Sequence, residues 1–169
     1  MKIDELDKKI LQLLVRDGRM SSAEIARTVD APERTVNYRI NTLIQRDVLS
    51  IVGHINRRFF GYEVMGDIFC NIEGADPEEV ARQISRFPEV SYVTISFGSR
   101  DISLQVFSKS NTELYEFVTK KLLKIPGVTN TTTVIVPHVV KDVFQWFPPE
   151  LMTPEESTAQ EEDTAVPSS

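Results

Sequence analysis

The stretch from Ser21 to Gln45 most constrains what this chain can fold into. Val36, Ile40 and Leu43 recur at helical spacing, so a helix formed here has one apolar side. The opposite side carries long polar side chains rather than the Glu and Lys of an ordinary solvated helix: Arg34, Tyr38, Asn41 and Gln45, flanked by Asn37 and Thr42. These side-chain types hydrogen-bond base edges and phosphates. The pattern predicts a DNA-recognition helix, with a merely solvated polar surface as the alternative.

Two shorter helices are predicted before this one. Apolar residues at helical spacing run through residues 3–14 and indicate the first. Ser21 and Glu24 match a capping box that opens the second. Pro32 suits the first position of the third helix, which we expect to end near Arg46. Three helices with a tight turn between the last two predict a helix-turn-helix.

The residues after the third helix indicate a wing. The stretch from Ser50 to Asn56 alternates apolar and polar residues around Gly53, which is typical of a short β-wing. Arg57 and Arg58 follow directly, where a wing or hinge could meet phosphate. A solvated linker is the other interpretation of this pair, and the sequence does not decide between them.

From Tyr62 onward the periodicity changes to a β-α-β-β-α-β order. The expected strands are Val64–Ile72, Val90–Phe97, Ile102–Phe107 and Val128–Val136, and the expected helices are Asp76–Phe87 and Asn111–Lys124. A repeat supports this order, because a Pro turn between a helix end and a strand start occurs in both halves. The prediction is α+β: a ferredoxin-like sandwich with two helices on one face of the sheet.

Charge is distributed unevenly along the 169 residues. Residues 1–60 have a net charge of +3, residues 61–142 of −3 and residues 143–169 of −6. The acidic total therefore comes largely from the C-terminal end and does not argue against DNA binding by the first segment, since phosphates respond to local charge. The single cysteine, Cys70, lies in an apolar run and is expected to be a small buried hydrophobe.

The last segment has a composition of its own. We expect the aromatic residues Phe144, Trp146 and Phe147 to pack on a partner surface or on the sheet edge. From about Met152 onward Thr, Ser, Glu, Ala and Pro dominate, which predicts disorder. No apolar run is long enough to cross a bilayer, so a soluble cytoplasmic protein with no membrane association is expected. The predicted divisions are 1–50, 51–63 (wing and hinge), 64–142 and 143–169.

These motifs, in this order, resemble the Lrp/AsnC (feast/famine) family of transcription regulators over about residues 3–141. The resemblance rests on Leu6-Asp7-Lys8-Lys9-Ile10-Leu11 with Asp17-Gly18-Arg19, Glu24-Ile25-Ala26, Thr35 to Leu43, Ile55 to Tyr62, Pro88-Glu89-Val90, Gly98 to Asp101, and Pro126-Gly127-Val128. It implies a winged helix-turn-helix joined by a hinge strand to a ligand-sensing sandwich. It also implies homodimers formed through the sandwich and multiples of dimers such as octamers.

The resemblance further implies an amino-acid effector bound between sandwiches, near the loop between the second and third strands. Its candidate residues are Gly98, Ser99, Arg100, Asp101, Thr131 and Thr133. Asp101 could accept a hydrogen bond from an α-ammonium group while loop N–H groups hold a carboxylate. The same loop is, structurally, an ordinary β-hairpin turn.

Three positions depart from the family pattern. Ala31 stands where a capping Ser or Thr is usual, and Asp47 stands where Gly is usual, although Asp adopts the left-handed conformation more readily than most residues. Arg100 replaces an aromatic residue. A cation at this position could favour an anionic effector, or leave the protein without an effector.

We expect two copies of the third helix to enter successive major grooves of double-stranded DNA. Arg34, Tyr38 and Asn41 are the expected base readers, and Arg39, Arg46, Arg57 and Arg58 the candidate phosphate contacts. Thr35, Asn37 and Thr42 complete the predicted DNA-binding set.

Functions other than a regulator controlled by an effector are also compatible with this domain order. One is an effector-independent regulator, and another is an oligomeric ligand-sensing or interaction module. Sirohaem decarboxylases share the two-domain layout, but the stretch from Ser91 to Phe97 lacks the His of their second sandwich strand. With no nucleophile–base pair elsewhere and no metal-ligand cluster, we expect no enzyme activity, no metal and no cofactor.

Overall fold

The computed structural model describes residues 2–152, which form two compact units. One unit contains residues 2–54 together with 141–152, and the other contains residues 55–140. The C-terminal segment therefore belongs with the N-terminal helices and not with the sandwich that precedes it. The prediction of disorder from about residue 152 falls on residues 153–169, outside the described part of the chain.

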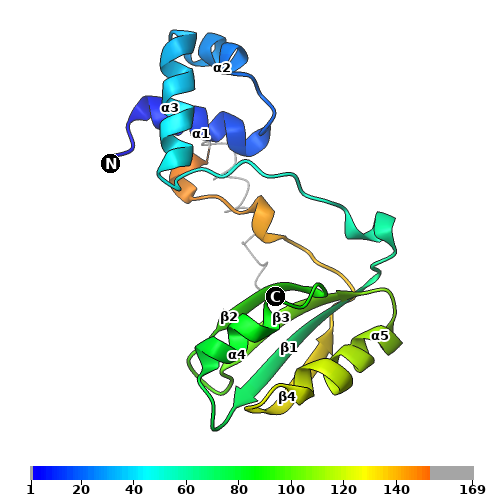
Figure 1. The fold of residues 1–169 in the computed structure, drawn as a ribbon. Coiled ribbons are helices and arrows are strands. Elements are labelled where there is room, and N and C mark those ends of the chain that lie inside the picture. Colours follow the sequence, from blue (N-terminus) through cyan, green and yellow to red (C-terminus); the bar gives the residue numbers. More distant parts are fainter. Residues whose placement is uncertain (1, 153–169) are drawn as a thin grey trace, which may run out of the picture. The chain divides into compact units, whose positions relative to one another are not determined.

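Three helices form the first unit (Figure 1): α1 (Glu5–Arg16), α2 (Ser22–Val29) and α3 (Glu33–Gln45). Each contributes fully buried apolar side chains to one core, among them Ile10, Ile25, Val36 and Leu43. The predicted helix-turn-helix is therefore present. Its driving force is the burial of one apolar stripe from each helix.

Local signals set the helix boundaries. The Ser21 hydroxyl accepts from the Glu24 amide, and the Glu24 carboxylate accepts from the Ser21 amide, so the predicted capping box is formed. Pro32 lies at the N-cap of α3, one position earlier than predicted, and makes no side-chain cap. Asp47 adopts the left-handed conformation at φ 55°, which confirms that Asp serves here in place of Gly.

A buried ion pair joins α1 to α3. The Asp7 carboxylate has no solvent-exposed surface and accepts from Arg39 Nη1 at 3.1 Å and 3.2 Å. The same nitrogen donates to Asp4 Oδ2 at 2.7 Å. The Asp7 amide, and secondly Arg39, lower the pKa of the Asp4 carboxyl. Arg39 therefore holds the start of α1 against the middle of α3.

The segment between α3 and the sandwich does not contain the predicted wing or hinge strand. Residues 49–56 have no strand, and the only regular element before the sheet is the short 3₁₀ helix η1 (Arg57–Phe60). Alternating sequence indicates that a segment can be a strand, but a strand also needs a neighbour for its backbone hydrogen bonds. This single chain provides no such neighbour for residues 49–56.

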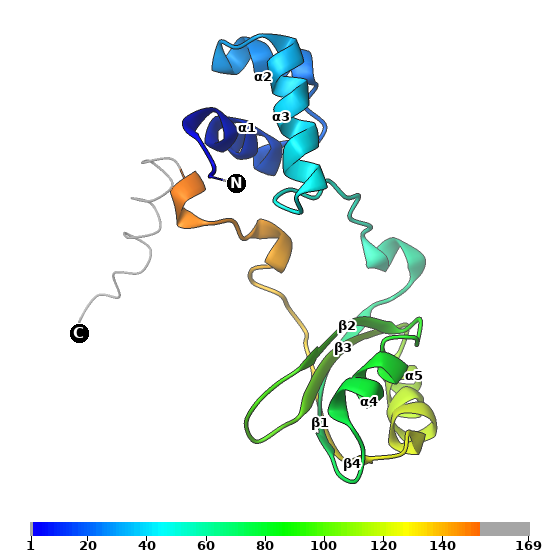
Figure 2. The same cartoon turned by 60° about the vertical axis from the view of Figure 1, so that its left-hand side comes forward.

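The second unit has the predicted βαββαβ order (Figure 2). Its elements are β1 (Val64–Ile72), α4 (Pro77–Ile84), β2 (Val90–Ile95), β3 (Ile102–Ser108), α5 (Asn111–Glu116) and β4 (Val128–Ile135). The four strands are antiparallel in the order β2-β3-β1-β4, which is the ferredoxin-like arrangement. After α5 the helical path continues through a π turn and a 3₁₀ turn to Lys124.

Both helices cover one face of this sheet (Figures 1 and 2). The buried face includes Ile68 and its register partner Leu104, which pack with Ile84 of α4 and Leu114 of α5. The other face carries a row across all four strands, and no helix of this unit covers it: Tyr92, Gln105, Asp67 and Val134. The sheet therefore has one dry face and one open face.

The turn before β4 requires glycine. Gly127 has a φ of +94°, and a Cβ placed there would lie 2.5 Å from the Ala75 Cβ. Both constraints exclude a larger residue without a shift of the backbone. The Pro126-Gly127-Val128 motif is therefore a structural requirement of the fold.

The C-terminal segment returns to the first unit. The 3₁₀ helix η5 (Pro149–Leu151) contacts α1, and Leu151 packs against the core of the three helices. Figure 2 shows this segment, in orange, beside α1. Trp146 is largely exposed. The prediction that Phe144, Trp146 and Phe147 pack on a partner surface or on the sheet edge concerns other residues of this segment and stays a prediction.

We predict that Cys70 does not react with thiol reagents in the folded protein. Its side chain is fully buried, and burial raises the pKa of its thiol to about 11. At pH 8 about one thiol in a thousand would be the reactive thiolate. Labelling with a chromogenic disulfide should be slow in buffer and complete in guanidinium chloride. Rapid labelling of the native protein would contradict the burial.

We predict that Arg39→Ala lowers the thermal midpoint of helix unfolding by several degrees, because it leaves the buried Asp7 carboxylate without a cation. Circular dichroism at 222 nm measures the midpoint. Adding Asp7→Asn to Arg39→Ala should recover part of the loss, since the uncharged amide no longer needs a cation. Arg34→Ala is the matched control on the same helix and should leave the midpoint unchanged. Equal midpoints for Arg39→Ala and Arg34→Ala would refute this account of Arg39.

Candidate nucleic-acid interface and ligand loop

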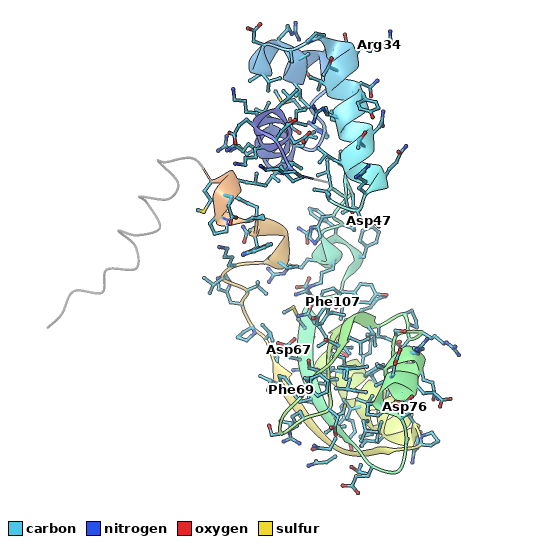
Figure 3. All side chains as sticks on the ribbon, turned by 90° about the vertical axis from the view of Figure 1, so that its left-hand side faces the viewer. Arg34, Asp47, Asp67, Phe69, Asp76 and Phe107 are labelled. Atoms are coloured by element: carbon cyan, nitrogen blue, oxygen red, sulfur yellow. The ribbon has the colours of Figure 1, made fainter. Side chains whose placement is uncertain are left out.

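Helix α3 presents two opposite faces. Val36 and Leu43 are fully buried against α1 and α2, which fixes the rotation of the helix about its axis. The opposite side exposes Arg34, Tyr38 and Asn41, and Tyr38 is 68% exposed. Figure 3 shows Arg34 near the start of α3, projecting away from the helices. The predicted base readers thus share one accessible surface.

Two contacts order this surface. The Asn41 amide donates to the Asn37 Oδ1 at 3.0 Å, and the Thr42 hydroxyl donates to the Tyr38 carbonyl at 2.8 Å. Asn37 and Asn41 both keep free hydrogen-bonding capacity, because each amide has one donor nitrogen and one acceptor oxygen. Within residues 2–152, Arg34 has neither an ion pair nor a side-chain hydrogen bond. This surface can donate to and accept from base edges.

The other predicted contacts on α3 divide by position. Arg46 is exposed at the C-terminal end of the helix, whereas Thr35 and Thr42 are half-buried at its sides. Arg39 points toward α1 and not toward the exposed side of α3, since its guanidinium is held by Asp4 and Asp7. The structure thus gives Arg39 a packing role that the sequence did not reveal.

The two arginines that follow the expected wing also differ. Arg57 lies 4.7 Å from the centre of the Phe107 ring, and its Nη1 donates to the Tyr62 carbonyl. Burial, and secondly the neighbouring Arg58, lower the pKa of Arg57. Of the pair, Arg57 is half-buried and has two partners, whereas Arg58 is exposed.

The β2–β3 loop is fixed onto the end of β1 and the middle of β4. Arg100 Nη1 donates to Asn71 Oδ1 at 2.6 Å, and its Nη2 donates to the Thr132 hydroxyl at 3.0 Å. The Asn71 amide donates to the Ser99 carbonyl at 3.0 Å. Asp101 Oδ2 accepts from the Ile72 amide at 2.8 Å. The loop is therefore a braced structure and not a free hairpin tip.

The structure does not gather all the predicted effector residues. Gly98, Ser99, Arg100 and Asp101 lie together in the loop, but Thr131 and Thr133 pair in register with Cys70 and Ile68, whose side chains face the helices. Thr132 has the opposite orientation and contacts Arg100. The predicted set therefore divides between two faces of the sheet.

Sequence reasoning missed Asn71 and Thr132. Both lie in strands, at 29 and 32 residues from Arg100, so no local pattern links them to the loop. Phe69 pairs in register with both Ser103 and Thr132, because β1 lies between β3 and β4 in the sheet. Knowledge of this strand register would have identified Asn71 and Thr132 as neighbours of the loop.

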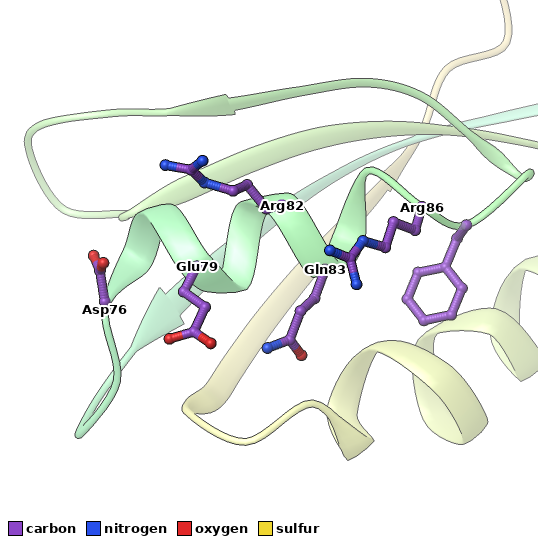
Figure 4. Close-up of a pocket in the computed structure, with 6 residues that line it drawn as sticks. Asp76, Glu79, Arg82, Gln83 and Arg86 are labelled. Carbon is purple, nitrogen blue, oxygen red and sulfur yellow. The ribbon is translucent and has the colours of Figure 1, made fainter.

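One surface cavity lies on the sandwich, with a volume of about 690 Å³. Figure 4 shows its lining along α4: Asp76, Glu79, Arg82, Gln83, Arg86 and Phe87. All of these are exposed except the half-buried Phe87, and none belongs to the predicted effector set. We assign this cavity to the solvated face of α4. No helix within residues 2–152 is long and apolar enough to cross a membrane.

Family comparisons match both parts of the chain. The AsnC-type helix-turn-helix domain matches residues 3–44, and the Lrp/AsnC ligand binding domain matches residues 68–145. An uncharacterized HTH-type transcriptional regulator of Pyrococcus horikoshii is 39% identical over 83% of this chain and 90% of its own length. A similar regulator of Pyrococcus abyssi is 38% identical over the same shares.

Solved structures show the same fold. A transcriptional regulator of Neisseria meningitidis, solved as a complex with L-Met, has a TM-score of 0.81 at 23% identity and covers 89% of this chain and 100% of its own. AsnC of Escherichia coli has a TM-score of 0.77 at 22% identity and covers 85% of this chain and 99% of its own. Matches to a DNA-binding domain and a ligand-binding domain favour a regulator over the enzyme alternative. The chain belongs to the Lrp/AsnC family of transcriptional regulators.

Proposed function

We propose that this regulator reads its DNA site with Arg34, Tyr38 and Asn41 of α3. One observation carries the proposal: the side of α3 opposite the buried Val36 and Leu43 is exposed and free of carboxylates. Arginine pairs with guanine, and asparagine with adenine, through two hydrogen bonds in the major groove. Arg34 and Asn41 are the side chains on this surface suited to those pairings.

Arg46 and Arg58 are the phosphate contacts that we retain in this proposal. Both guanidiniums are exposed, whereas Arg39 is bound by two carboxylates and Arg57 lies on the Phe107 ring. The charge of the Arg39 guanidinium is already offset by these two carboxylates, which weakens its attraction for a phosphate. The ion pair of Arg39 includes a buried carboxylate, so breaking it would be costly.

The proposed active form is a homodimer, or a multiple of dimers such as an octamer, joined through the open face of the sheet. Tyr92 and Val134 lie on that face at 60% and 47% exposure, and within the sandwich unit no helix covers them. One recognition helix on a weakly basic segment binds DNA weakly, since affinity grows with the number of neutralised phosphates. Two copies would place two helices about 34 Å apart, on successive major grooves.

A small effector with a carboxylate group is proposed to bind at the β2–β3 loop. The Neisseria relative was solved with L-Met, and the matching family domain is a ligand-binding domain. In this chain Arg100 uses two of its five N–H donors on Asn71 and Thr132, so donors remain for a carboxylate. An amino acid is the effector class that this proposal names.

The bracing of this loop also supports a second candidate function, an effector-independent regulator. Arg100 and Asp101, the two charged groups expected to hold an amino acid, already have protein partners. In that case the network stabilises the sandwich, and DNA binding does not respond to a small molecule.

Mutations of the base readers and mutations of the phosphate contacts should have different effects on DNA binding. Arg34→Ala or Asn41→Ala should lose about 1–3 kcal/mol of binding to the preferred site and relax the preference at particular base pairs. Fluorescence anisotropy with site variants measures both effects.

Arg46→Ala and Arg58→Ala serve as the contrast. Each should weaken binding to all sequences alike and reduce the salt slope by about 0.9. If all four variants bound the preferred site like the wild type, this surface would not be the DNA interface.

Amino acids should be titrated against the wild type and Arg100→Gln, with thermal midpoint and light-scattering mass as readouts. An effector that binds through Arg100 should raise the midpoint of the wild type and have little effect on Arg100→Gln. Arg82→Gln is the matched control, since Arg82 pairs with Glu78 on α4 and not with a loop residue. The same shift in Arg100→Gln would place the effector elsewhere. No shift with any amino acid would favour the effector-independent regulator.

A further inference from the structure

The C-terminal segment is anchored to the DNA-binding unit at a defined place. Leu151 is half-buried against the core of the three helices, and η5 contacts α1. Glu5 and, more weakly, Glu150 raise the pKa of Lys8 on α1, so an acidic residue of the segment lies near the helix. This contact fixes the point from which residues 153–169 continue.

Those residues have one dominant chemical property. They contain five carboxylates and no Lys or Arg: Glu155, Glu156, Glu161, Glu162 and Asp163. The α3 surface has the opposite character, because Arg34 and Arg46 are exposed and Tyr38, Asn41 and Gln45 add no carboxylate. Within residues 2–152 neither of these two arginines has an ion-pair partner. The two segments are complementary in charge.

The chain is long enough to join them. Extended chain spans about 3.3 Å per residue, so the ten residues from 153 to 162 reach roughly 33 Å. A compact unit of this size is about 28 Å across, from the usual scaling of radius with chain length. A segment that starts on α1 can therefore reach the exposed face of α3. A covalent link of this length gives an effective concentration in the millimolar range.

We propose that the acidic segment 153–163 occupies the α3 surface when DNA is absent and competes with DNA phosphates for Arg34 and Arg46. Carboxylates and phosphates are interchangeable anionic partners for arginine. Exposed ion pairs are individually weak, so occupancy depends on the tether and on low salt. The contact of Leu151 with the helical core is the anchor that sets the effective concentration of the acidic segment near α3. The result is a regulator whose DNA affinity is limited by its own C-terminal segment.

Three variants that keep both folded units test this inference, which rests on the proposed DNA-binding function of α3. The first ends at Met152, the second carries Gln or Asn at the five carboxylate positions, and the third is Leu151→Ala with the acidic segment intact. The first two should bind DNA about tenfold tighter than the wild type in 50 mM salt, and the gain should shrink as salt rises. Leu151→Ala should give a smaller gain. A neutral-segment variant that binds like the wild type would overturn the proposal.

A second measurement needs no DNA. Tyr38 is exposed at the centre of the α3 surface, so a photo-reactive benzoylphenylalanine in its place should cross-link to whatever covers it. Mass spectrometry of the wild-type chain should find cross-links to peptides from residues 153–169 at low salt, and far fewer in the neutral-segment variant. The absence of such cross-links at low salt would refute occupancy, even if truncation tightened DNA binding through bulk charge alone. If no variant bound DNA with sequence preference while the cross-links formed, the proposed function would fail and the occupancy would stand.

Discussion

The ion pair between Arg39 and the buried Asp7 holds α3 against α1, and the arrangement of the DNA-binding unit depends on this contact. Asp7 also belongs to the capping box of α1, so one carboxylate links a helix start to the middle of the recognition helix. Together with the burial of Val36 and Leu43, this contact sets the rotation of α3. Arg34, Tyr38 and Asn41 are therefore exposed because other residues of the same helix are held inward. The packing of α3 therefore determines which of its side chains are available to bind DNA.

Much of the fold could be predicted because its signals are local. Capping residues such as Ser21 and Asp76 begin their helices as expected, and strand β1 has the predicted bounds, Val64–Ile72. The prediction of a wing and a hinge strand was wrong for the single chain. Alternating residues indicate the periodicity of a strand, but they do not identify the neighbouring strand with which it would pair. The roles of Arg39 and Arg57 could not be predicted either. Arg39 pairs with residues 32 and 35 positions away, and Arg57 rests on a ring 50 positions away.

The β2–β3 loop shows the same limit at a candidate site. Its sequence predicted where Gly98, Ser99, Arg100 and Asp101 would lie, because a turn between two strands is a local feature. Its partners Asn71 and Thr132 come from two other strands, and only the register brings them there. The C-terminal anchor is a third case, because Leu151 meets α1 from the far end of the chain. In each case the contact joins residues that are far apart in the sequence, so no local pattern predicts it.

The central claim is that the exposed side of α3 reads DNA sequence. Selection of bound fragments from a random DNA pool, carried out in parallel for the wild type and Arg34→Ala, tests it most directly. The account predicts a two-fold symmetric motif for the wild type, with half-sites about one helical turn apart. It further predicts that Arg34→Ala loses the preference at the same position in both half-sites and keeps the spacing. An identical motif for both proteins, or no enriched motif with the wild type, would contradict the account.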